Sequence, residues 1–291
     1  MKVLELFAGI GGCAFALQPH DQILLAVDQS PYATEVYTHV WPEHRHTRWN
    51  LAGVKTHQLD VGADLWWMSP PCQPFTVRGK AGDVDDPRCQ PLIRLLEHIA
   101  AIRPPAIALE NVPGFETSRM RTMLLSTLDT AGYQVRERIL CPTQLGIPMK
   151  RSRYYLVARL GRLAPWPALR PHPRRVEDYV GGVAPDVLAS LTLPADLQTR
   201  FAGKLPISDP QDFPWVGCFT GAYGNSPVFA GSYWKGPRGP RYLDRSEVQR
   251  FMGFDSRLTW PGTIDRRRAW KLLGNSLSVD AVREVLQVLR R

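Results

Sequence analysis

Short apolar runs alternate with stretches of helical spacing over the first 160 residues of the chain. The apolar runs, each the length of a buried strand, are 2–7, 23–27, 65–68, 106–109 and 154–158. Apolar residues recur with helical spacing between most of these runs, in 13–17, 31–40, 91–102 and 119–128. The alternation predicts an α/β fold, in which helices cover both faces of a doubly wound, mostly parallel sheet.

A different pattern begins near residue 163. Prolines, glycines and aromatic residues replace the periodic spacing, so the local structure of 163–258 does not follow from it. Periodicity returns in 278–289, which we expect to be a helix that is apolar on one side and capped by Ser278. The chain is therefore expected to divide into a larger α/β domain (1–162), a smaller inserted domain (163–258) and a C-terminal segment (259–291) that returns to the first domain.

The composition is that of an ordinary globular protein of 291 residues with a net charge of +9. This charge is compatible with a polyanionic partner but does not require one. No apolar run approaches the roughly 18 residues of a membrane span, and the glycines after Leu6 are unlike a signal peptide. The five scattered cysteines form no C-x-x-C pair, so we expect neither a zinc site nor disulfides, and a cytoplasmic location.

A glycine-rich segment lies between the first strand and the first helix. It consists of Phe7, Ala8, Gly9, Ile10, Gly11 and Gly12. Glycines let a backbone approach a ligand closely, and a helix begins with free N–H groups. Asp28 ends the next strand, where an acidic side chain accepts hydrogen bonds from ribose hydroxyls. A nucleoside-bearing cofactor and a plain tight turn are both consistent with this pattern.

Three prolines surround one thiol in the segment 69–76, which reads Ser-Pro-Pro-Cys-Gln-Pro-Phe-Thr. Proline and its effect on the preceding residue exclude a helix here, so Cys72 lies on a stiff loop after a central strand. A fixed thiol suits a nucleophile, whose attacking atom needs a defined position. The alternative is an inert, half-buried cysteine, which is how we interpret the other four.

Further candidate groups follow later strands or precede the last helix. Glu110 comes directly after the strand 106–109, where it could donate a proton to a ring nitrogen or remain a solvated or salt-bridged surface residue. Strand alternation places Arg151 and Arg153 on one side, suited to phosphate or base oxygens, unless the stretch is merely solvated. Gly274-Asn275-Ser276 is either a simple turn or part of a site.

Taken together and in this order, these segments resemble the cytosine-C5 methyltransferases that use S-adenosylmethionine. The resemblance implies a Rossmann-like methyltransferase domain (1–162), a target-recognition domain (163–258) and no metal. It assigns the cofactor to Phe7, Ala8, Gly9, Ile10, Gly11, Gly12, Asp28, Gln29, Asn50, Leu51, Pro70, Asn275 and Ser276. The nucleophile loop would be Pro71-Cys72-Gln73, the base-binding motif Glu110-Asn111-Val112, and Arg151 and Arg153 the two arginines of Q-x-R-x-R; the segment 241–254 is similar to the penultimate motif.

A narrower resemblance is to the branch of this family that methylates an anticodon-loop cytosine of aspartate tRNA. It rests on 70–76, 110–116 and 142–148, and on the tripeptide Cys218-Phe219-Thr220 followed by Tyr223-Gly224. Met149 stands where DNA-acting members carry Gln, which favours RNA. Pro113 and the proline-rich segment 163–175 are less typical of the RNA branch.

The family mechanism would assign a role to each candidate group. The Cys72 thiolate would add to cytosine C6, Glu110 would hold N3, and Arg151 and Arg153 would bind the base carbonyl and a phosphate. Other substrate contacts would come from Pro71, Gln73, Asn111, Val112, Cys218, Phe219 and Thr220. The acceptor of the C5 proton is left open, and the chain is expected to act as a monomer. Candidate side chains that guide tRNA are Arg88, Arg119, Arg121 and Lys235.

Three other functions are weighed against tRNA methylation. The first is methylation of duplex DNA in a restriction–modification system. The second is non-catalytic binding of nucleic acid, against which the intact Cys72, Glu110 and arginine set argues. The third, a nicotinamide dehydrogenase, leaves the segment 70–75 unexplained.

Overall fold

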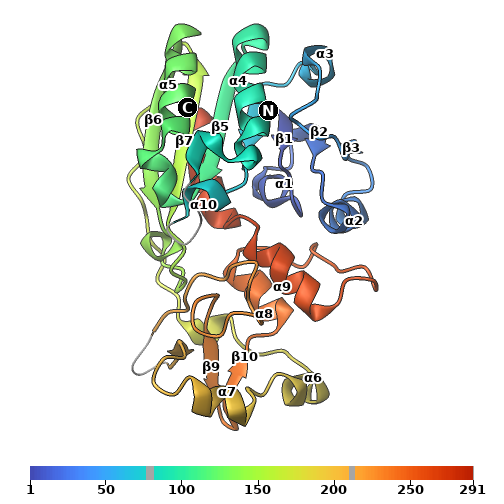
Figure 1. Cartoon of the computed structure of the whole chain (residues 1–291), viewed down its shortest axis with the longest axis vertical. Coiled ribbons are helices and arrows are strands. Elements are labelled where there is room, and N and C mark those ends of the chain that lie inside the picture. Colours follow the sequence, from blue (N-terminus) through green and yellow to red (C-terminus); the bar gives the residue numbers. More distant parts are fainter. Residues whose placement is uncertain (77–81, 210–213, 291) are drawn as a thin grey trace. The chain divides into compact units, whose positions relative to one another are not determined.

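The computed structural model describes residues 1–76, 82–209 and 214–290, which form two compact units. The first unit comprises 1–140, 152–168 and 282–291, and the second comprises 141–151 and 169–281. Helix α10 (Val279–Leu289) runs across this division, so the chain ends in the first unit (Figure 1). These units differ from the expected segments, because 141–151 and most of 259–291 pack with the second unit.

The first unit is built on a seven-stranded sheet with the order β3-β2-β1-β4-β5-β7-β6. Its strands are β1 (Lys2–Leu6), β2 (Gln22–Val27), β3 (His46–Thr47), β4 (Leu65–Met68), β5 (Ala106–Asn111), β6 (Tyr133–Leu140) and β7 (Arg153–Leu160). Strands β3, β2, β1, β4 and β5 are parallel, whereas β7 is antiparallel to both of its neighbours. The predicted mostly parallel sheet is therefore confirmed.

Four helices of the first unit lie where the sequence spacing predicts them, and the short helix α3 (Thr56–Leu59) was not predicted. The predicted helices are α1 (Gly12–Ala16), α2 (Pro31–Val40), α4 (Gln90–Ile102) and α5 (Arg119–Thr130), with short 3₁₀ turns η1 (Gln73–Phe75), η2 (Asp83–Asp85), η3 (Pro87–Cys89) and η4 (Pro113–Thr117). Helix α2 begins as its sequence indicates: the Ser30 hydroxyl accepts a hydrogen bond from the Ala33 amide, and Pro31 occupies the first turn.

The two faces of the sheet contact different helices. Leu4 and Leu6 of β1 join a buried cluster that includes residues of α4 and α5. Strand alternation turns Glu5 to the opposite face, where it contacts α1 and α2. Strand β1, Lys-Val-Leu-Glu-Leu, is thus apolar apart from Lys2 at its start and the carboxyl group of Glu5.

The predicted strand 106–109 is two residues too short. Strand β5 continues through Glu110 and Asn111, which pair with Tyr155 and Tyr154 of β7. Both polar residues are buried. The sequence could not show this extension, because a polar side chain inside a strand has the same signature as the end of the strand.

The second unit comprises short elements joined by long loops. They are η5 (Pro142–Leu145), η6 (Val176–Asp178), α6 (Pro185–Ser190), α7 (Ala195–Arg200), β8 (Ile207–Ser208), β9 (Tyr233–Gly236), β10 (Gly239–Tyr242), α8 (Arg245–Phe251) and α9 (Arg266–Gly274). Strands β10, β9 and β8 form a small sheet.

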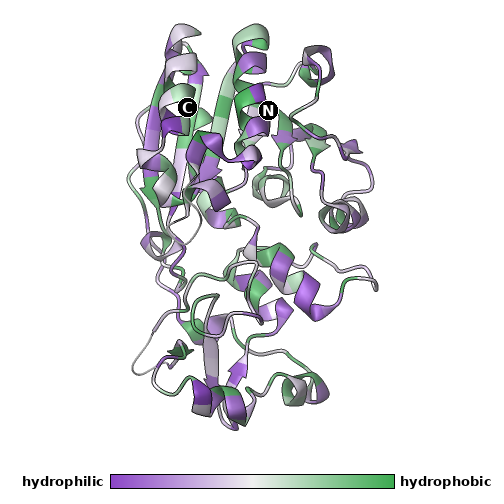
Figure 2. Ribbon diagram, in the orientation of Figure 1, coloured by the Kyte–Doolittle hydropathy of each residue, from purple (hydrophilic) through white to green (hydrophobic). Residues whose placement is uncertain are grey.

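Aromatic side chains form the core of the second unit. The ring centroid of Tyr223 lies 5.0 Å from that of Phe219 and 4.9 Å from that of Trp270. Gly231 allows the backbone to pass these rings, since a Cβ there would lie 2.7 Å from both Phe219 and Tyr223. Such a core comes from loops as much as from helices, which explains why the sequence shows no periodicity here. In Figure 2 helix α9 carries both apolar and polar colours.

One predicted helix cap is wrong. Ser278 precedes α10 as expected, but its buried hydroxyl has no hydrogen-bond partner within the part of the chain that the structure describes. Across the same described residues, no helix is both long enough and apolar enough to cross a bilayer.

Gly114 should be essential for stability because its backbone lies against the backbone of another loop at the sheet edge. A Cβ at this position would lie 2.2 Å from the carbonyl oxygen of Phe75. We expect Gly114→Ala to lower the free energy of unfolding by roughly 1–3 kcal/mol, measured as a shift of the urea midpoint. Gly53→Ala is the matched control, since its nearest contact would be 3.9 Å. Equal stability of the two variants would contradict this close approach.

Candidate active site

The candidate residues of the first unit gather at one edge of the sheet. Strands β1, β2, β4 and β5 are parallel, so the segments that follow them leave the sheet on the same side. Strand β7 is antiparallel and therefore begins at this edge with Arg153. Open α/β sheets bind ligands beyond the carboxyl ends of their strands.

The glycine loop after β1 is held by Asp28. The Gly9 amide donates to Asp28 Oδ2 and the Ser30 amide donates to Asp28 Oδ1. The N···O distance is 2.8 Å in both hydrogen bonds. The loop needs positive φ at Phe7 (56°), Gly9 (56°) and Gly11 (87°). At the two glycines this conformation costs little.

The two sides of this loop differ in the space they leave. A Cβ on Gly9 would meet nothing within 4 Å, whereas one on Gly11 would lie 3.1–3.3 Å from Trp41 and Tyr37. One side of the loop is thus open to a ligand and the other packs on α2. Gly12, Ala8 and Ile10 are buried.

The other predicted cofactor residues of this unit surround the same edge. Gln29 and Asn50 are exposed, and Leu51 and Pro70 are buried. The side-chain carbonyl of Asn50 accepts a hydrogen bond from the Ala52 amide, with an N···O distance of 3.0 Å. This hydrogen bond forms a turn after β3.

The loop that carries Cys72 is fixed at both ends. The Trp67 indole donates to the Ser69 hydroxyl over 2.9 Å, and the Asn111 side-chain amide donates to the Pro70 carbonyl over 3.2 Å. The Cys72 carbonyl accepts from the Phe75 amide over 2.9 Å, and its side chain is partly exposed. A partly exposed thiol on a fixed backbone meets the geometric requirement of a nucleophile.

Glu110 and Arg153 form an ion pair at the end of β5. Arg153 Nε lies 3.2 Å from Glu110 Oε1, and the two side chains are only 13% and 10% exposed. Glu110 is therefore not a solvated surface carboxylate. A charge pair at this depth is stronger than an exposed one and fixes the orientation of the carboxyl group.

Arg151 has different surroundings from Arg153, and the prediction that alternation aligns the two is wrong. Strand β7 begins at Arg153, so Arg151 lies outside it, in the second unit. Its guanidinium, in a residue only 3% exposed, donates to the carbonyls of Phe219 (2.6 Å), Gly274 (3.1 Å) and Ser276. Arg151 thus ties together two segments that are far apart in sequence.

These two segments touch along their backbones. A Cβ on Gly274 would lie 2.1 Å from the carbonyl carbon of Thr220, and one on Gly221 would lie 2.5 Å from Asn275 Oδ1. The predicted tripeptide Cys218-Phe219-Thr220 and the predicted segment around Asn275 and Ser276 are therefore brought together. Phe219 is fully buried and Asn275 is exposed.

The four basic residues considered as tRNA guides all face carboxylates. Arg88 pairs with Asp86 (2.5 Å), Arg119 with Asp85, Arg121 with Glu137 (2.6 Å), and Lys235 with Asp209 (2.6 Å). Exposed pairs of this kind contribute little to stability, but they reduce the charge that each side chain offers to a phosphate.

Sequence reasoning missed one titratable residue of β1, the strand that precedes the glycine loop. Glu5 is completely buried, and its burial raises the pKa of the carboxyl to about 8. The Cys13 amide donates to it over 3.0 Å and the Tyr37 hydroxyl over 3.1 Å. The available signal was a single acid inside the apolar run 2–7.

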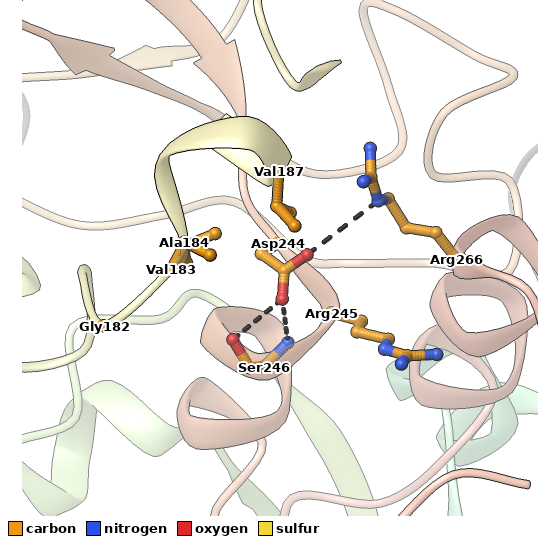
Figure 3. A pocket seen from close by; sticks show the side chains of 8 residues that line it. All are labelled: Gly182, Val183, Ala184, Val187, Asp244, Arg245, Ser246 and Arg266. Carbon is orange, nitrogen blue, oxygen red and sulfur yellow. Dashed lines mark hydrogen bonds and ion pairs between the residues drawn. The ribbon is translucent and has the colours of Figure 1, made fainter. Parts of the chain in front are cut away.

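A cavity of about 370 Å³ lies in the second unit, away from every predicted site residue of that unit in sequence. Gly182, Val183, Ala184, Val187, Asp244, Arg245, Ser246 and Arg266 line it. Figure 3 shows Asp244 between its two partners: the Ser246 amide (2.9 Å) and Arg266, whose Nε is 3.9 Å away. Since Asp244 caps α8, these contacts stabilise the fold, and the strand-end geometry locates the candidate site better than the cavity does.

Among the described residues, no three His, Cys, Asp or Glu side chains are grouped to hold a metal ion.

Comparison with known proteins identifies a family that matches more than half of the chain. The family model for C-5 cytosine-specific DNA methylases matches residues 1–179. A human tRNA (cytosine(38)-C(5))-methyltransferase is 39% identical over 166 residues, which are 55% of this chain and 42% of the human protein. The chain thus aligns with less than half of the length of that relative.

Two relatives match over nearly the whole chain. The tRNA (cytosine(38)-C(5))-methyltransferase of Schizosaccharomyces pombe is 31% identical over an alignment of 324 residues. The alignment covers 99% of this chain and 96% of the S. pombe protein. The crystal structure of the S. pombe Dnmt2 methyltransferase superposes with a TM-score of 0.88 at 30% identity, covering 99% of this chain and 98% of that one.

Arg151 and Arg153 should differ in what their loss disturbs. Lysine cannot reproduce the several N–H donors of Arg151, so Arg151→Lys should destabilise the second unit by roughly 2–4 kcal/mol. The expected signature is faster amide exchange in 218–221 and 274–277. Arg153→Lys is the matched control and should leave exchange in these segments unchanged; identical behaviour of the two variants would refute the separate roles.

Proposed function

The chain belongs to the C-5 cytosine-specific DNA methylase family, and on this premise we propose that it methylates C5 of a cytosine in the anticodon loop of a tRNA. The observation that carries the proposal is the alignment over nearly the full length with a tRNA (cytosine(38)-C(5))-methyltransferase. The ordered site at the sheet edge supports it, because Cys72 follows β4, Glu110 lies near the end of β5 and Arg153 begins β7. Cytosine 38 of an aspartate or related tRNA is the proposed target.

The residues of the glycine loop fit S-adenosylmethionine. The open side of Gly9 leaves room for a ligand against the backbone, and Asp28 and Gln29 follow the neighbouring strand. These residues, with Phe7–Gly12, Asn50, Leu51 and Pro70, would hold the cofactor, and Asn275 and Ser276 are further proposed cofactor residues. When bound, S-adenosylmethionine supplies an electrophilic methyl group on a sulfonium.

Cys72 and Glu110 would activate the base together. Cytosine C5 is a poor nucleophile until the Cys72 thiolate adds to C6, which breaks the C5=C6 double bond and makes C5 electron-rich. Glu110, in its protonated form, would give a proton to N3 and so stabilise the charge that this addition places on the ring. C5 then accepts the methyl group, a base removes the C5 proton, and re-formation of the double bond expels Cys72.

The two arginines would contribute in different ways. Arg153 Nε lies 3.2 Å from the Glu110 carboxyl, and Arg153 is the proposed donor to the base carbonyl. Arg151 donates to three backbone carbonyls, so we assign it the positioning of Cys218-Phe219-Thr220. Those residues, with Pro71, Gln73, Asn111 and Val112, are the proposed contacts to RNA.

A loop in tRNA suits this chemistry on energetic grounds. The target base must leave its stack before C6 can be attacked, and this costs less in a loop than in a duplex. All five cysteines are free thiols, which fits a reducing compartment, and we propose that the chain works in the cytoplasm as a monomer. Duplex DNA is the second candidate substrate, favoured by the description of the family and by the net charge of +9.

Transfer of tritium from labelled S-adenosylmethionine tests the proposal. We expect incorporation into tRNA that falls at least about 10³-fold in Cys72→Ala, because the addition to C6 is lost. Cys141→Ala, at another partly exposed thiol, is the matched control and should keep its activity. Incorporation into methylation-free DNA alone would replace tRNA by DNA as the substrate and leave the mechanism in place.

Glu110→Gln should separate base activation from binding. The amide cannot give up a proton to N3, so kcat should fall about 10²–10⁴-fold while tRNA affinity changes little. Single-turnover rates and filter binding measure the two effects.

A tRNA with 5-fluorocytosine at the target position should form a covalent adduct with the wild type, since fluorine cannot leave as the C5 proton does. Failure to form it in an active enzyme would exclude the Cys72–C6 step.

A further inference from the structure

A carboxyl group lies inside the central strand beneath the glycine loop. Glu5 of β1 is 1% exposed and has Trp67 of β4 and Ala26 of β2 as its strand neighbours. Its Oε1 accepts the Cys13 amide, 3.0 Å away in the first turn of α1. Helix α1 directly continues the Phe7–Gly12 loop, so this hydrogen bond joins the loop to the sheet.

A chain of hydrogen-bonding groups leads from Glu5 toward the surface. The Tyr37 hydroxyl lies 3.1 Å from Glu5 Oε2 and 3.1 Å from His44 Nδ1. Tyr37 is fully buried, whereas the His44 side chain is 17% exposed, and its Nε2 lies 3.7 Å from Glu43, which is 64% exposed. The Trp41 ring stacks on His44 with 5.1 Å between centroids, which fixes the imidazole at the end of the chain.

The groups around Glu5 do not compensate a buried negative charge. Those that face it are Cys13 on α1, Tyr37 on α2, His44 and Glu43 after α2, His46 on β3 and Asp28 after β2. Burial lowers the pKa of His44 and of His46, and burial raises the pKa of Tyr37 and of Cys13. Near neutral pH these four side chains are therefore uncharged, and Asp28 and Glu43 add only negative charge.

We propose that Glu5 is a positioning residue for the Phe7–Gly12 loop, that it holds the loop closed as a neutral acid, and that it loses its proton to water through Tyr37 and His44. Its importance for the cofactor rests on the proposed function. The neutral acid donates from Oε2 to the Tyr37 oxygen, and the Tyr37 hydroxyl donates to His44 Nδ1. One proton moves from each group to the next, and one leaves from His44 Nε2, so that no charge remains on Tyr37.

Loss of this proton should loosen the loop. In the closed loop burial raises the pKa of Glu5 to about 8, whereas a loop that admits water would restore the ordinary value of 4.5. The closed form therefore binds its proton more tightly, and its advantage over the open form falls as pH rises from 4.5 to 8. The population of the open form should rise about tenfold per pH unit in this range and level off above it.

Amide exchange in the cofactor-free protein tests the proposal. Wild type and Glu5→Gln are compared at the same pH, so that the intrinsic pH dependence of exchange cancels. The ratio of wild-type to variant exchange rates in 9–16 should rise about 50-fold between pH 6 and pH 8, increase about twofold more by pH 9 and then level off. A ratio that does not change with pH would overturn the role of Glu5.

Tyr37→Phe is a second, independent variant. It removes a hydrogen bond that favours the ionised carboxylate, so the increase in exchange should continue beyond pH 8. Tyr32→Phe, at an exposed tyrosine of the same helix, is the matched control and should follow the wild type. If the increase in exchange rate stops at the same pH in Tyr37→Phe as in the wild type, Tyr37 is excluded from the chain of proton transfers.

Infrared difference spectra give a signature that a purely structural role would not. The carbonyl stretch of a neutral carboxylic acid should be present in the wild type at pH 7, lost by pH 9 and absent from Glu5→Gln; its absence at pH 7 would refute a neutral Glu5. Added S-adenosylmethionine should slow exchange in 9–16 in both proteins. If it slows neither while the pH effect persists, the cofactor assignment fails and the role of Glu5 stands.

Discussion

The parallel order of β3, β2, β1, β4 and β5 forces every segment that follows these strands to the same edge of the sheet. The candidate segments of the first unit reach that edge because of the strand order, and hydrogen bonds from Gly9 to Asp28 and from Asn111 to Pro70 then join neighbouring segments. Arg153 reaches it for the opposite reason, because β7 is antiparallel and begins where β5 ends. The ion pair between Glu110 and Arg153 thus depends on one reversed strand in an otherwise parallel neighbourhood. A parallel β7 would place its first residue at the far edge.

The same constraint explains how much of the fold the sequence could reveal. A strand buried on both faces is mostly apolar, so β1, β2, β4 and β5 are visible as short apolar runs. Strand β6 lies at the edge of the sheet, and its alternating charges, Tyr-Gln-Val-Arg-Glu-Arg-Ile-Leu, conceal it. In the second unit, side chains from loops such as Phe219 and Tyr223 supply the core. No period links residues of this kind, so no pattern could predict their arrangement.

The candidate site divides along similar lines. Residue type and position after a strand are local properties, and they were sufficient to select Cys72 and Glu110 for the sheet edge. The partner of a side chain is not a local property. Arg151 and Arg153 are separated by one residue, yet one donates to carbonyls at 219, 274 and 276 and the other pairs with a carboxylate. Only the tertiary structure distinguishes an arginine that organises backbone from one that orients an acid.

Glu5 raises the question of why a carboxyl group occupies a strand that is otherwise apolar. The Cys13 amide needs an acceptor, and a glutamine of almost the same volume would supply a carbonyl oxygen without a titratable group. Stability alone therefore does not require an acid, because burial makes its ionised form costly. What only the acid provides is a change of charge beneath the loop, with Tyr37 and His44 as a route for the proton. The arrangement makes the order of the glycine loop a function of pH, while Cys72 and Glu110 remain on neighbouring strands whose backbone hydrogen bonds do not titrate.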